Sequence, residues 1–578
     1  MGVYQLTTYL ETGKPNAYCY EVNIVKLARK FAVNENRQPV IIVDGTSSLY
    51  DFSDFQSNNW LMGGQLRVCR HNLKKFVTAF KDAGIKLVFY FDGSNVDEKR
   101  HVWISRQNEK IKKQEHIFQK LKRGLCPNKN LLPALYGAFG RFILQHELDC
   151  EVLVSVGECD EEMAVFAQEH NCLAFLAQDS DFLIHKGAKY FLSMKHLDIK
   201  SMKTLCYNRA AFAESLSLNG DHLPLLGSLM GNDLVPFNEL KRFHEKLCQG
   251  YNHVITRVRR LADYVRKYPN SDLSKSCLLK IADDIGGDRN MAVFLESSIN
   301  CYNCKSVVGE DRRWGVMHEA RIRHTTCEIP PFVYPIMRGK PYELSVGLED
   351  FDGEMEAAAK VYRPMRQRFY GVLLHDDPAK RDTVEEWCVE SKKISEAALN
   401  VKVQRVPGNM HPGLLRLWTE NTSVINRRRW ELFLWCISPA LDRSALTYID
   451  PKYYVPAAVL YYLVHVDEHL LYDWEVEAII SQAVLLQTMK DRQLVSLRTQ
   501  IPEPRAVQVA SLFGRGVTTV LLVMAACGVP LKQMMPWLYY DGKLFLEQFL
   551  ERKNGFQRQF QGQVQCEFLS IRKFVYGE

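Results

Sequence analysis

The sequence lacks an apolar segment long enough to cross a membrane, since a spanning helix needs about 20 predominantly apolar residues. Its longest apolar stretch, flanked by Arg515 and Lys532, runs from Val517 to Leu531. We expect a buried helix there and no membrane partner. The opening residues also lack the charged start and apolar core of a secretory signal peptide, which predicts a cytosolic or nuclear chain.

Neither cysteine nor charge is concentrated. The 16 cysteines among the 578 residues form no dense framework, so we expect reduced thiols and not a disulfide scaffold. The net charge of +7 is small and only weakly indicates an anionic partner. We find no internal repeat, and the length predicts roughly two to four domains.

Four short apolar runs in the first third of the chain are typical of buried strands. They cover residues 39–44, 86–92, 150–156 and 173–177, and helical patterns lie between them, notably at 65–83 and 159–170. Strands that alternate with helices predict an α/β fold with a mostly parallel sheet flanked by helices. Side chains that follow the carboxyl ends of such strands meet at one edge of the sheet.

Beyond this region the composition changes. Residues 343–356 contain six acids, two glycines and no base, which is typical of an exposed linker. Later apolar patterns, at 454–465 and 474–489, predict a mainly helical C-terminal unit. We therefore predict a domain at 1–242, a helical extension at 243–342, an acidic linker at 343–356 and a helical domain at 357–578.

Seven acids follow the predicted strands or the turns beside them, and they are the candidate ligands of two metal ions. Magnesium and manganese prefer carboxylate oxygens, and two such ions about 4 Å apart can activate a water and stabilise a leaving oxygen. Seven carboxylates at one place would repel one another without cations. Taken singly, each acid is more often a helix cap or turn residue. The seven are Asp44, Asp92, Glu158, Asp160, Asp179, Asp181 and Asp233.

These motifs resemble those of the flap-endonuclease/XPG superfamily, a branch of the PIN-like nucleases. The matching segments are Met1-Gly2-Val3, Val43-Asp44-Gly45, Phe91-Asp92-Gly93, Gly157-Glu158-Cys159-Asp160, Gln178-Asp179-Ser180-Asp181 and Gly231-Asn232-Asp233. The resemblance implies that Gly2 approaches the substrate. It also implies that Asp44, Asp92, Glu158 and Asp160 serve mainly one metal, and Asp179, Asp181 and Asp233 the other.

A basic segment at 98–123 is helical in pattern, and alone it is as readily a solvated helix face as a binding site. The nuclease family carries a Lys and an Arg seven and fourteen residues after its second Asp, and Lys99 and Arg106 have these spacings. The resemblance therefore implies catalytic contacts from both to phosphate. On a helix, Lys110 and Lys113 extend the same basic side toward nucleic acid.

One departure concerns the segment after Asp233. Active members of the superfamily continue with a glycine-rich helix–two-turn–helix that grips duplex DNA, whereas residues 234–241 contain no glycine. We therefore expect RNA or single-stranded DNA as the ligand, or a lost nuclease activity, in preference to cleavage of duplex DNA.

A narrower resemblance covers nearly the whole chain. The blocks Tyr362–Tyr370, Gly514–Leu521 and Met535–Phe545 are similar to segments of the constitutive coactivators of peroxisome proliferator-activated receptor gamma. Membership of that family implies a protein partner, either a nuclear receptor or another transcription or ribonucleoprotein component. Sister branches of the family imply RNA binding. The resemblance favours the nucleus over the cytoplasm as the location. No Leu-x-x-Leu-Leu motif is present, so a receptor would have to contact another surface.

Two smaller signals remain open. Cys301, Cys304, His324 and Cys327 have the spacing of a zinc site, although plain buried thiols are the more common outcome in a cysteine-rich chain. Residues 427–430, three arginines and a tryptophan, suit either a nucleic-acid contact or a surface helix end, and we favour the helix end.

Two functions from different classes follow from these observations. The first is a nuclear coactivator or adaptor built on a nuclease-like, nucleic-acid-binding domain. The second is an active two-metal nuclease for DNA or RNA. The complete carboxylate set favours the nuclease, and the missing duplex grip and the coactivator blocks favour the adaptor.

Overall fold

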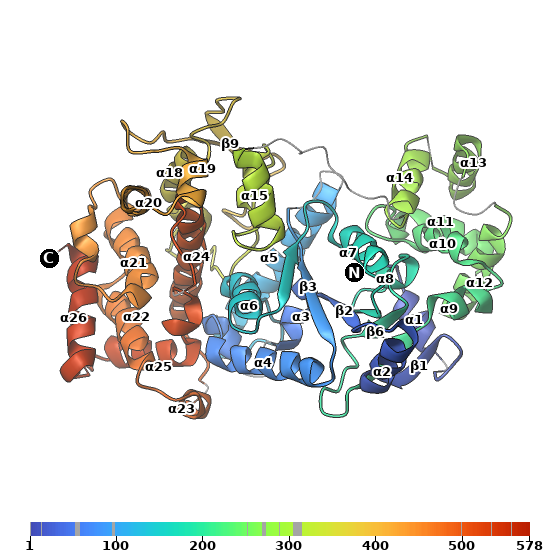
Figure 1. Cartoon of the computed structure of the whole chain (residues 1–578), viewed down its shortest axis with the longest axis horizontal. Coiled ribbons are helices and arrows are strands. Elements are labelled where there is room, and N and C mark those ends of the chain that lie inside the picture. Colours follow the sequence, from blue (N-terminus) through green and yellow to red (C-terminus); the bar gives the residue numbers. More distant parts are fainter. Residues whose placement is uncertain are drawn as a thin grey trace. The chain divides into compact units, whose positions relative to one another are not determined.

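The computed structural model describes the chain except residues 1, 13, 53–57, 95–98, 251–252, 269–272, 288, 304–314, 499, 533, 557 and 578. The chain forms two compact units, and each is assembled from separate segments (Figure 1). The first unit is Met1–Asp51, Lys75–Trp103 and Cys150–Gly309. The second unit is Phe52–Lys74, Ile104–Asp149 and Glu310–Glu578. Three unit boundaries fall inside helices, namely α3 (Gly45–Phe52), α4 (Leu66–Asp82) and α5 (Arg100–Lys122).

The first unit is built on a seven-stranded sheet with the order β1-β7-β6-β5-β2-β3-β4. The strands from β6 to β4 pair in parallel, whereas β7 and β1 are antiparallel additions at one edge. This confirms the predicted mostly parallel α/β fold, and all four predicted strands are present. The strands are β1 (Cys19–Asn23), β2 (Val40–Asp44), β3 (Lys86–Phe91), β4 (Glu151–Val154), β5 (Ala174–Ala177), β6 (Tyr190–Ser193) and β7 (Lys203–Tyr207).

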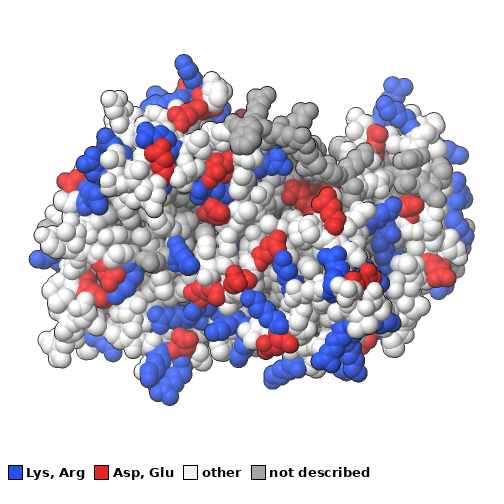
Figure 2. All heavy atoms as spheres, viewed as in Figure 1, with Lys and Arg blue, Asp and Glu red and all other residues white. Residues whose placement is uncertain are grey.

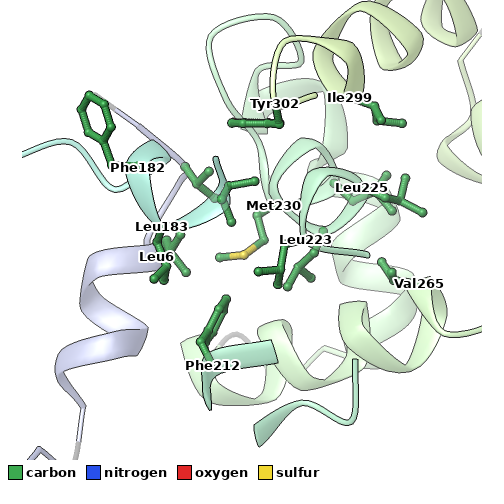
Figure 3. Close-up of a cluster of buried hydrophobic side chains, with 14 of the residues drawn as sticks. Leu6, Phe182, Leu183, Phe212, Leu223, Leu225, Met230, Val265, Ile299 and Tyr302 are labelled. Atoms are coloured by element: carbon green, nitrogen blue, oxygen red, sulfur yellow. The ribbon is translucent and has the colours of Figure 1, made fainter. Parts of the chain in front are cut away.

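Helices complete the first unit and supply its core. The helices are α1 (Leu6–Glu11), α2 (Ile24–Glu35), α3 (Gly45–Phe52), α7 (Cys159–Glu169), α8 (Asp181–Ile184), α9 (Arg209–Ser215), α10 (Leu223–Met230), α11 (Phe237–Cys248), α12 (Val254–Val265), α13 (Lys275–Ile285) and α14 (Arg289–Asn300). Figure 3 shows Leu6 of α1, Leu183 of α8, Leu223 and Met230 of α10 and Val265 of α12 converging, and each is almost fully buried. Burial of one such side chain stabilises the fold by about 1.5–3 kcal/mol.

The second unit is mainly helical, as predicted for the C-terminal part, with one small sheet of order β10-β9-β8. Its strands are β8 (Tyr342–Leu344), β9 (Thr383–Cys388) and β10 (Leu399–Lys402). Its other helices are α6 (Ala134–His146), α15 (Val316–Thr325), α16 (Val333–Met337), α17 (Ala358–Val361), α18 (Arg363–Leu373), α19 (Leu414–Thr419), α20 (Ser423–Ile437), α21 (Tyr454–Val466), α22 (Asp473–Leu486), α23 (Asp491–Ser496), α24 (Pro504–Cys527), α25 (Gly542–Lys553) and α26 (Gly562–Tyr576). Short 3₁₀ turns are η1 (Asn58–Met62), η4 (Arg443–Leu446), η5 (Pro451–Tyr453) and η6 (Pro536–Leu538).

Helix α24 is the central element of the second unit. It packs against α6, α18, α20, α21 and α25, and 89% of its most apolar 18-residue window is buried. Among the described helices it alone has the length and apolar composition to cross a membrane. Its tight packing depends on Gly516, where a Cβ would lie 2.2 Å from the hydroxyl oxygen of Tyr362. The buried helix predicted near Val517–Leu531 is thus confirmed as far as Cys527.

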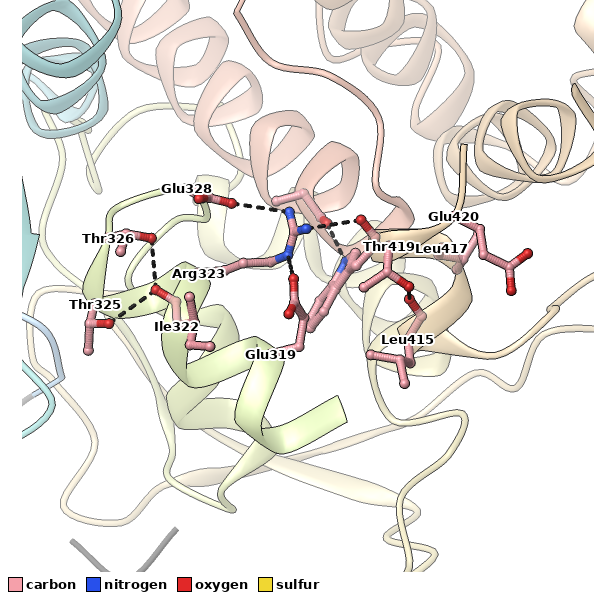
Figure 4. A network of polar contacts seen from close by, with 12 residues as sticks. Glu319, Ile322, Arg323, Thr325, Thr326, Glu328, Leu415, Leu417, Thr419 and Glu420 are labelled. Carbon is pink, nitrogen blue, oxygen red and sulfur yellow. Dashed lines mark hydrogen bonds and ion pairs between the residues drawn. The ribbon is translucent and has the colours of Figure 1, made fainter. Parts of the chain in front are cut away.

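Buried polar contacts join the remaining elements of this unit. Arg366 of α18 donates to both carboxylate oxygens of Glu386 in β9, at 2.7 and 2.6 Å, and the Tyr370 hydroxyl donates to the same carboxylate at 2.6 Å. Burial alone would raise the pKa of Glu386, but the charge of Arg366 and these hydrogen bonds outweigh it and lower the pKa. In the network of Figure 4, Arg323 of α15 donates to the Trp418 carbonyl of α19 at 2.9 Å and also pairs with the partly exposed Glu319 and Glu328.

The acidic stretch at 343–356 differs from the exposed linker expected there. Residues 342–344 form β8, and Glu343, Glu349 and Asp350 are buried. Two of these acids are buried beside partners: Glu349 accepts the Ala358 N–H at 2.9 Å, and Asp350 pairs with the distant Lys122 at 2.8 Å. The other acids of the stretch, Asp352, Glu354 and Glu356, are exposed as expected. The four domain boundaries predicted from the sequence stay a prediction.

Candidate metal centre

The first two predicted ligands stand at the carboxyl ends of neighbouring parallel strands. Asp44 is the last residue of β2, and its carboxylate accepts the Ser47 N–H at 3.1 Å, which caps the first turn of α3. Asp92 follows β3, and its own N–H donates to the Thr46 hydroxyl at 3.1 Å. The strand order places both acids at the same edge of the sheet.

The other acids stand at helix starts and turns. Glu158 is the N-cap of α7 and Asp160 lies in its first turn, where the helix dipole favours negative charge. Asp179 follows β5 and accepts the N–H of Asp181, the first residue of α8, at 3.4 Å. Asp233 follows the end of α10.

The structure brings the seven acids together. One carboxylate oxygen from each of Asp160, Asp179 and Asp181 lies within 4.8 Å of the other two. Asp160 therefore groups with the acids assigned by resemblance to the second metal. Burial, followed by repulsion from Asp179, Asp44 and Asp181, raises the pKa of Asp160. Glu158, Asp160, Asp181 and Asp233 line one small hollow.

The same two causes act on the neighbouring acids. Burial and the charge of Asp92 raise the pKa of Asp44 from 3.8 to about 6. Burial and the charge of Asp179 raise the pKa of Asp181 from 3.8 to about 7. Raised carboxyl pKa values mean that the ionised cluster is costly in the protein by itself, which is the condition that a bound cation relieves.

Lys99 lies inside this group of acids. It pairs with Glu158, and it also attracts Asp160 and Asp233. Burial alone would lower the pKa of Lys99, but the charge of Glu158 outweighs it and raises the pKa. Among the described residues that line the hollow, Lys99 is the one with a permanent positive charge.

Sequence reasoning missed a polar support behind the acids. The Tyr302 hydroxyl donates to Asp181 Oδ1 at 2.9 Å and accepts from the Asn232 side-chain amide at 3.0 Å. Asn232 also donates to Ser298 at 2.8 Å, so the chain after α10 is tied to α14. The Gly-Asn-Asp motif pointed toward Asn232, but no spacing connected Tyr302 with acids more than a hundred residues away. The Tyr302 hydroxyl fixes one carboxylate oxygen of Asp181.

The N-terminal glycine packs against the cluster. Gly2 has a φ of +47°, and a Cβ there would lie 1.8 Å from Asp179 Oδ1. The chain continues past Ser180, whose hydroxyl donates to the Val3 carbonyl at 3.4 Å. A glycine is therefore required at this position by space as well as by backbone conformation.

Three other predicted residues belong to the second unit. Arg106, Lys110 and Lys113 lie on α5, where burial and then the charges of Arg106, Arg515 and Lys113 lower the pKa of Lys110. The three side chains thus form one basic face, and Arg515 of α24 joins it. Sequence reasoning missed the contribution of Arg515 to this face, because the contact depends on the packing of α24. We call these four residues the basic face.

The zinc prediction stays a prediction. Cys304 lies outside the described residues, Cys301 belongs to the first unit, and His324 and Cys327 belong to the second. Cys301 lines the carboxylate hollow, and burial raises the pKa of its thiol to about 12.

The donor set of the carboxylate group fits hard divalent cations. Oxygen ligands dominate it, several are half-buried, and one lysine is too little charge to neutralise seven acids. When bound, magnesium or manganese would neutralise the cluster and attract a phosphate oxygen. The starts of α7 and α8 position Glu158, Asp160 and Asp181, and the Tyr302 hydroxyl holds the Asp181 carboxylate by a hydrogen bond.

Comparisons with known proteins agree with the sequence blocks. The profile described as FAM120A-like domain matches residues 216–306. The chain is 30% identical to the "Constitutive coactivator of peroxisome proliferator-activated receptor gamma" of Bos taurus, over 96% of this chain and 92% of that protein. It is 27% identical to the protein of the same name from Mus musculus, over 96% and 89%. Among solved structures, human GEN1 with Holliday junction DNA is 14% identical and covers 64% of this chain and 80% of that chain, with a TM-score of 0.32.

Proposed function

Because the chain belongs to the family of constitutive coactivators of peroxisome proliferator-activated receptor gamma, we propose that it is a coactivator-type adaptor that also binds nucleic acid. The carboxylate group of the first unit would hold one or two divalent cations. The cations would then bind the phosphate backbone of a strand. The observation that carries this proposal is the convergence of the acids, of which Glu158, Asp160 and Asp233 attract Lys99.

Positive charge also attracts a phosphate backbone, and the second unit carries a separate basic face that would bind nucleic acid by itself. The basic face combines Arg106, Lys110 and Lys113 with Arg515. On the side of the molecule drawn in Figure 2, basic and acidic side chains are interspersed. We therefore attribute binding to local groups and not to the small net charge of +7.

The names of the relatives indicate the protein partner. They are called coactivators of a nuclear receptor, so we propose a nuclear receptor as a partner of this chain and the nucleus as its place of action. No Leu-x-x-Leu-Leu motif occurs in the sequence, so the receptor would contact a different surface.

A metal-dependent nuclease is the second candidate function. The completeness of the carboxylate set favours it, because binding alone does not require seven acids. The segment after Asp233 lacks the glycine-rich duplex grip, so single-stranded or structured RNA and DNA would be the substrates.

One experiment separates the two functions. Purified full-length protein is incubated with labelled single-stranded, flap and hairpin DNA and RNA, with Mg²⁺, Mn²⁺ or EDTA. The adaptor predicts metal-dependent binding without cleavage. Cleavage that needs metal and disappears in the Asp179→Asn/Asp181→Asn variant establishes the nuclease. If the protein binds the nucleic acids with the same affinity in Mg²⁺ or Mn²⁺ as in EDTA, the metal-dependent part of the proposal is wrong.

The basic face has a matched test on its own helix. Arg106→Ala/Lys113→Ala should weaken binding of a single-stranded 20-mer and flatten the salt dependence, since each phosphate contact releases counterions. The control is Lys112→Ala/Arg123→Ala, which removes the same charge from two exposed positions, one on α5 outside the basic face and one directly after the helix. Equal losses in both variants would show that total charge matters and the basic face does not.

A further inference from the structure

A second candidate binding site lies wholly inside the second unit. A cavity of about 950 Å³ is lined by residues of α20, the segment that contains η4 and η5, the start of α21 and the chain after α24. Figure 1 labels the three helices α20, α21 and α24. Ligand sites for small molecules have volumes of about 300–1,000 Å³. Neither the carboxylate group nor the basic face contributes to this cavity.

Aromatic rings form one side of the cavity. Trp430 of α20 and Tyr454 of α21 lie edge to face, with ring centroids 5.2 Å apart and planes at 80°. Both line the cavity and are partly exposed. Tyr448, on the segment between η4 and η5, is 84% exposed and adjoins the lining residue Thr447. Exposed rings beside a cavity offer surfaces on which a flat ligand can stack.

Positive charge lines the cavity without an opposing acid. Its described lining includes Arg429, Arg443 and Lys532, and no Asp or Glu. Arg443 and Lys532 are exposed, and neither has an ion-pair partner among the described residues. The acids that adjoin the cavity in sequence have other partners: Asp442 caps η4, and Asp450 pairs with Lys452 at 3.2 Å.

Arg429 fixes the wall of the cavity. Its guanidinium donates to the carbonyls of Leu417 and Glu420, at 2.8 and 2.7 Å, and to the Asn426 side chain at 2.6 Å. The Asn426 amide donates in turn to Asn421 at 3.1 Å. The sequence predicted a surface helix end for residues 427–430, but Arg429 is buried. It holds the end of α19 against α20 and leaves Arg443 and Lys532 as the cations available to a ligand.

We propose that this cavity binds a nucleoside phosphate, with the base on Trp430 and Tyr454 and the phosphate on Arg443 and Lys532. A flat ring that carries a dianion matches two aromatic rings beside two cations. The lining residues come from helices and turns, so they offer no strand edge to an extended peptide. A free mononucleotide and a nucleotide within a single strand share this chemistry.

The test is calorimetric titration of the full-length protein in EDTA, which removes any metal-dependent binding elsewhere in the chain. The probes are AMP and UMP, the corresponding nucleosides, inorganic phosphate and a 5′-phosphorylated oligouridine. We expect the monophosphates to bind at least about tenfold more tightly than the nucleosides or phosphate alone, because both halves of the site are used. Oligouridine that binds about tenfold more tightly than UMP identifies a strand as the source, and equal affinity identifies a free nucleotide.

Two variants assign the binding to this cavity. Arg443→Ala/Lys532→Ala should weaken monophosphate binding about tenfold or more, and Trp430→Leu should weaken it and abolish ligand-dependent change in tryptophan fluorescence. The control variant is Lys402→Ala/Arg492→Ala, which removes the same charge from exposed positions elsewhere in the second unit. It should bind the monophosphates with wild-type affinity. Because Arg443 and Lys532 are exposed, their replacement should not unfold the protein, and a thermal melt checks this. Absence of monophosphate binding up to about 10 mM, or equal affinity in the Arg443/Lys532 variant, overturns the proposal.

Discussion

Replacing Asp181 with Asn should stabilise the metal-free protein, and the gain should grow with pH. Burial and the neighbouring Asp179 raise the Asp181 pKa from 3.8 to about 7, so the folded state keeps this proton where the unfolded chain has lost it. Between these two pH values the folded state binds more protons, and its stability therefore falls as pH rises. Asn does not titrate, yet its side-chain oxygen can still accept the hydrogen bond from Tyr302.

The size of the effect follows from the pKa rise. A rise from 3.8 to about 7 corresponds to about 4 kcal/mol once the group is ionised, and most of this develops above pH 5. Because Asp160 and Asp179 share the repulsion, we expect a gain that grows by roughly 2–3 kcal/mol between pH 5 and pH 8. Buried His185, whose pKa is lowered to about 3, acts in the opposite direction but is present in both proteins and cancels.

The assay is urea unfolding of wild type and Asp181→Asn in EDTA at several pH values between 5 and 8. Asp283→Asn, at an exposed position of α13, is the control and should follow the wild type. Mg²⁺ at a hundredfold excess over Kd should reduce the difference, since wild type gains about 2.7 kcal/mol and the variant gains less. A stability difference that is flat across this pH range in EDTA would refute the electrostatic reasoning.

Three further changes test other parts of the structure. Gly2→Ala should lower the free energy of unfolding by about 1–3 kcal/mol and weaken Mg²⁺ binding, because its Cβ would meet Asp179; calorimetry with unchanged Mg²⁺ affinity would contradict this contact. Tyr302→Phe should cost about 1–2 kcal/mol in unfolding and shift the Mg²⁺ affinity, while an unshifted affinity would mean that its hydroxyl does not position the site. Glu386→Gln should cost about 3–5 kcal/mol by leaving the buried Arg366 uncompensated, and a melting temperature equal to wild type would exclude a stabilising role for this pair.

The sequence by itself determined the α/β part of the fold and the candidate acids. Short apolar runs such as 39–44 and 86–92 are buried on both faces in a parallel sheet, so they carry a strong local signal. Each of these two runs ends in an acid, Asp44 or Asp92, and the geometry of a parallel sheet then places the two acids at one edge. The mainly helical second half was predictable for the same reason, since its apolar periodicity is local.

Only the tertiary structure decided which distant residues complete the sites. Tyr302 reaches Asp181 across 121 positions, and Arg515 joins the basic face because α24 packs inside the second unit. Acidity misled the prediction for part of 343–356, because Glu349 and Asp350 are buried beside partners that the local composition does not show. Local patterns report the state of one segment, whereas a long-range hydrogen bond or ion pair exists only after the chain has brought both partners together.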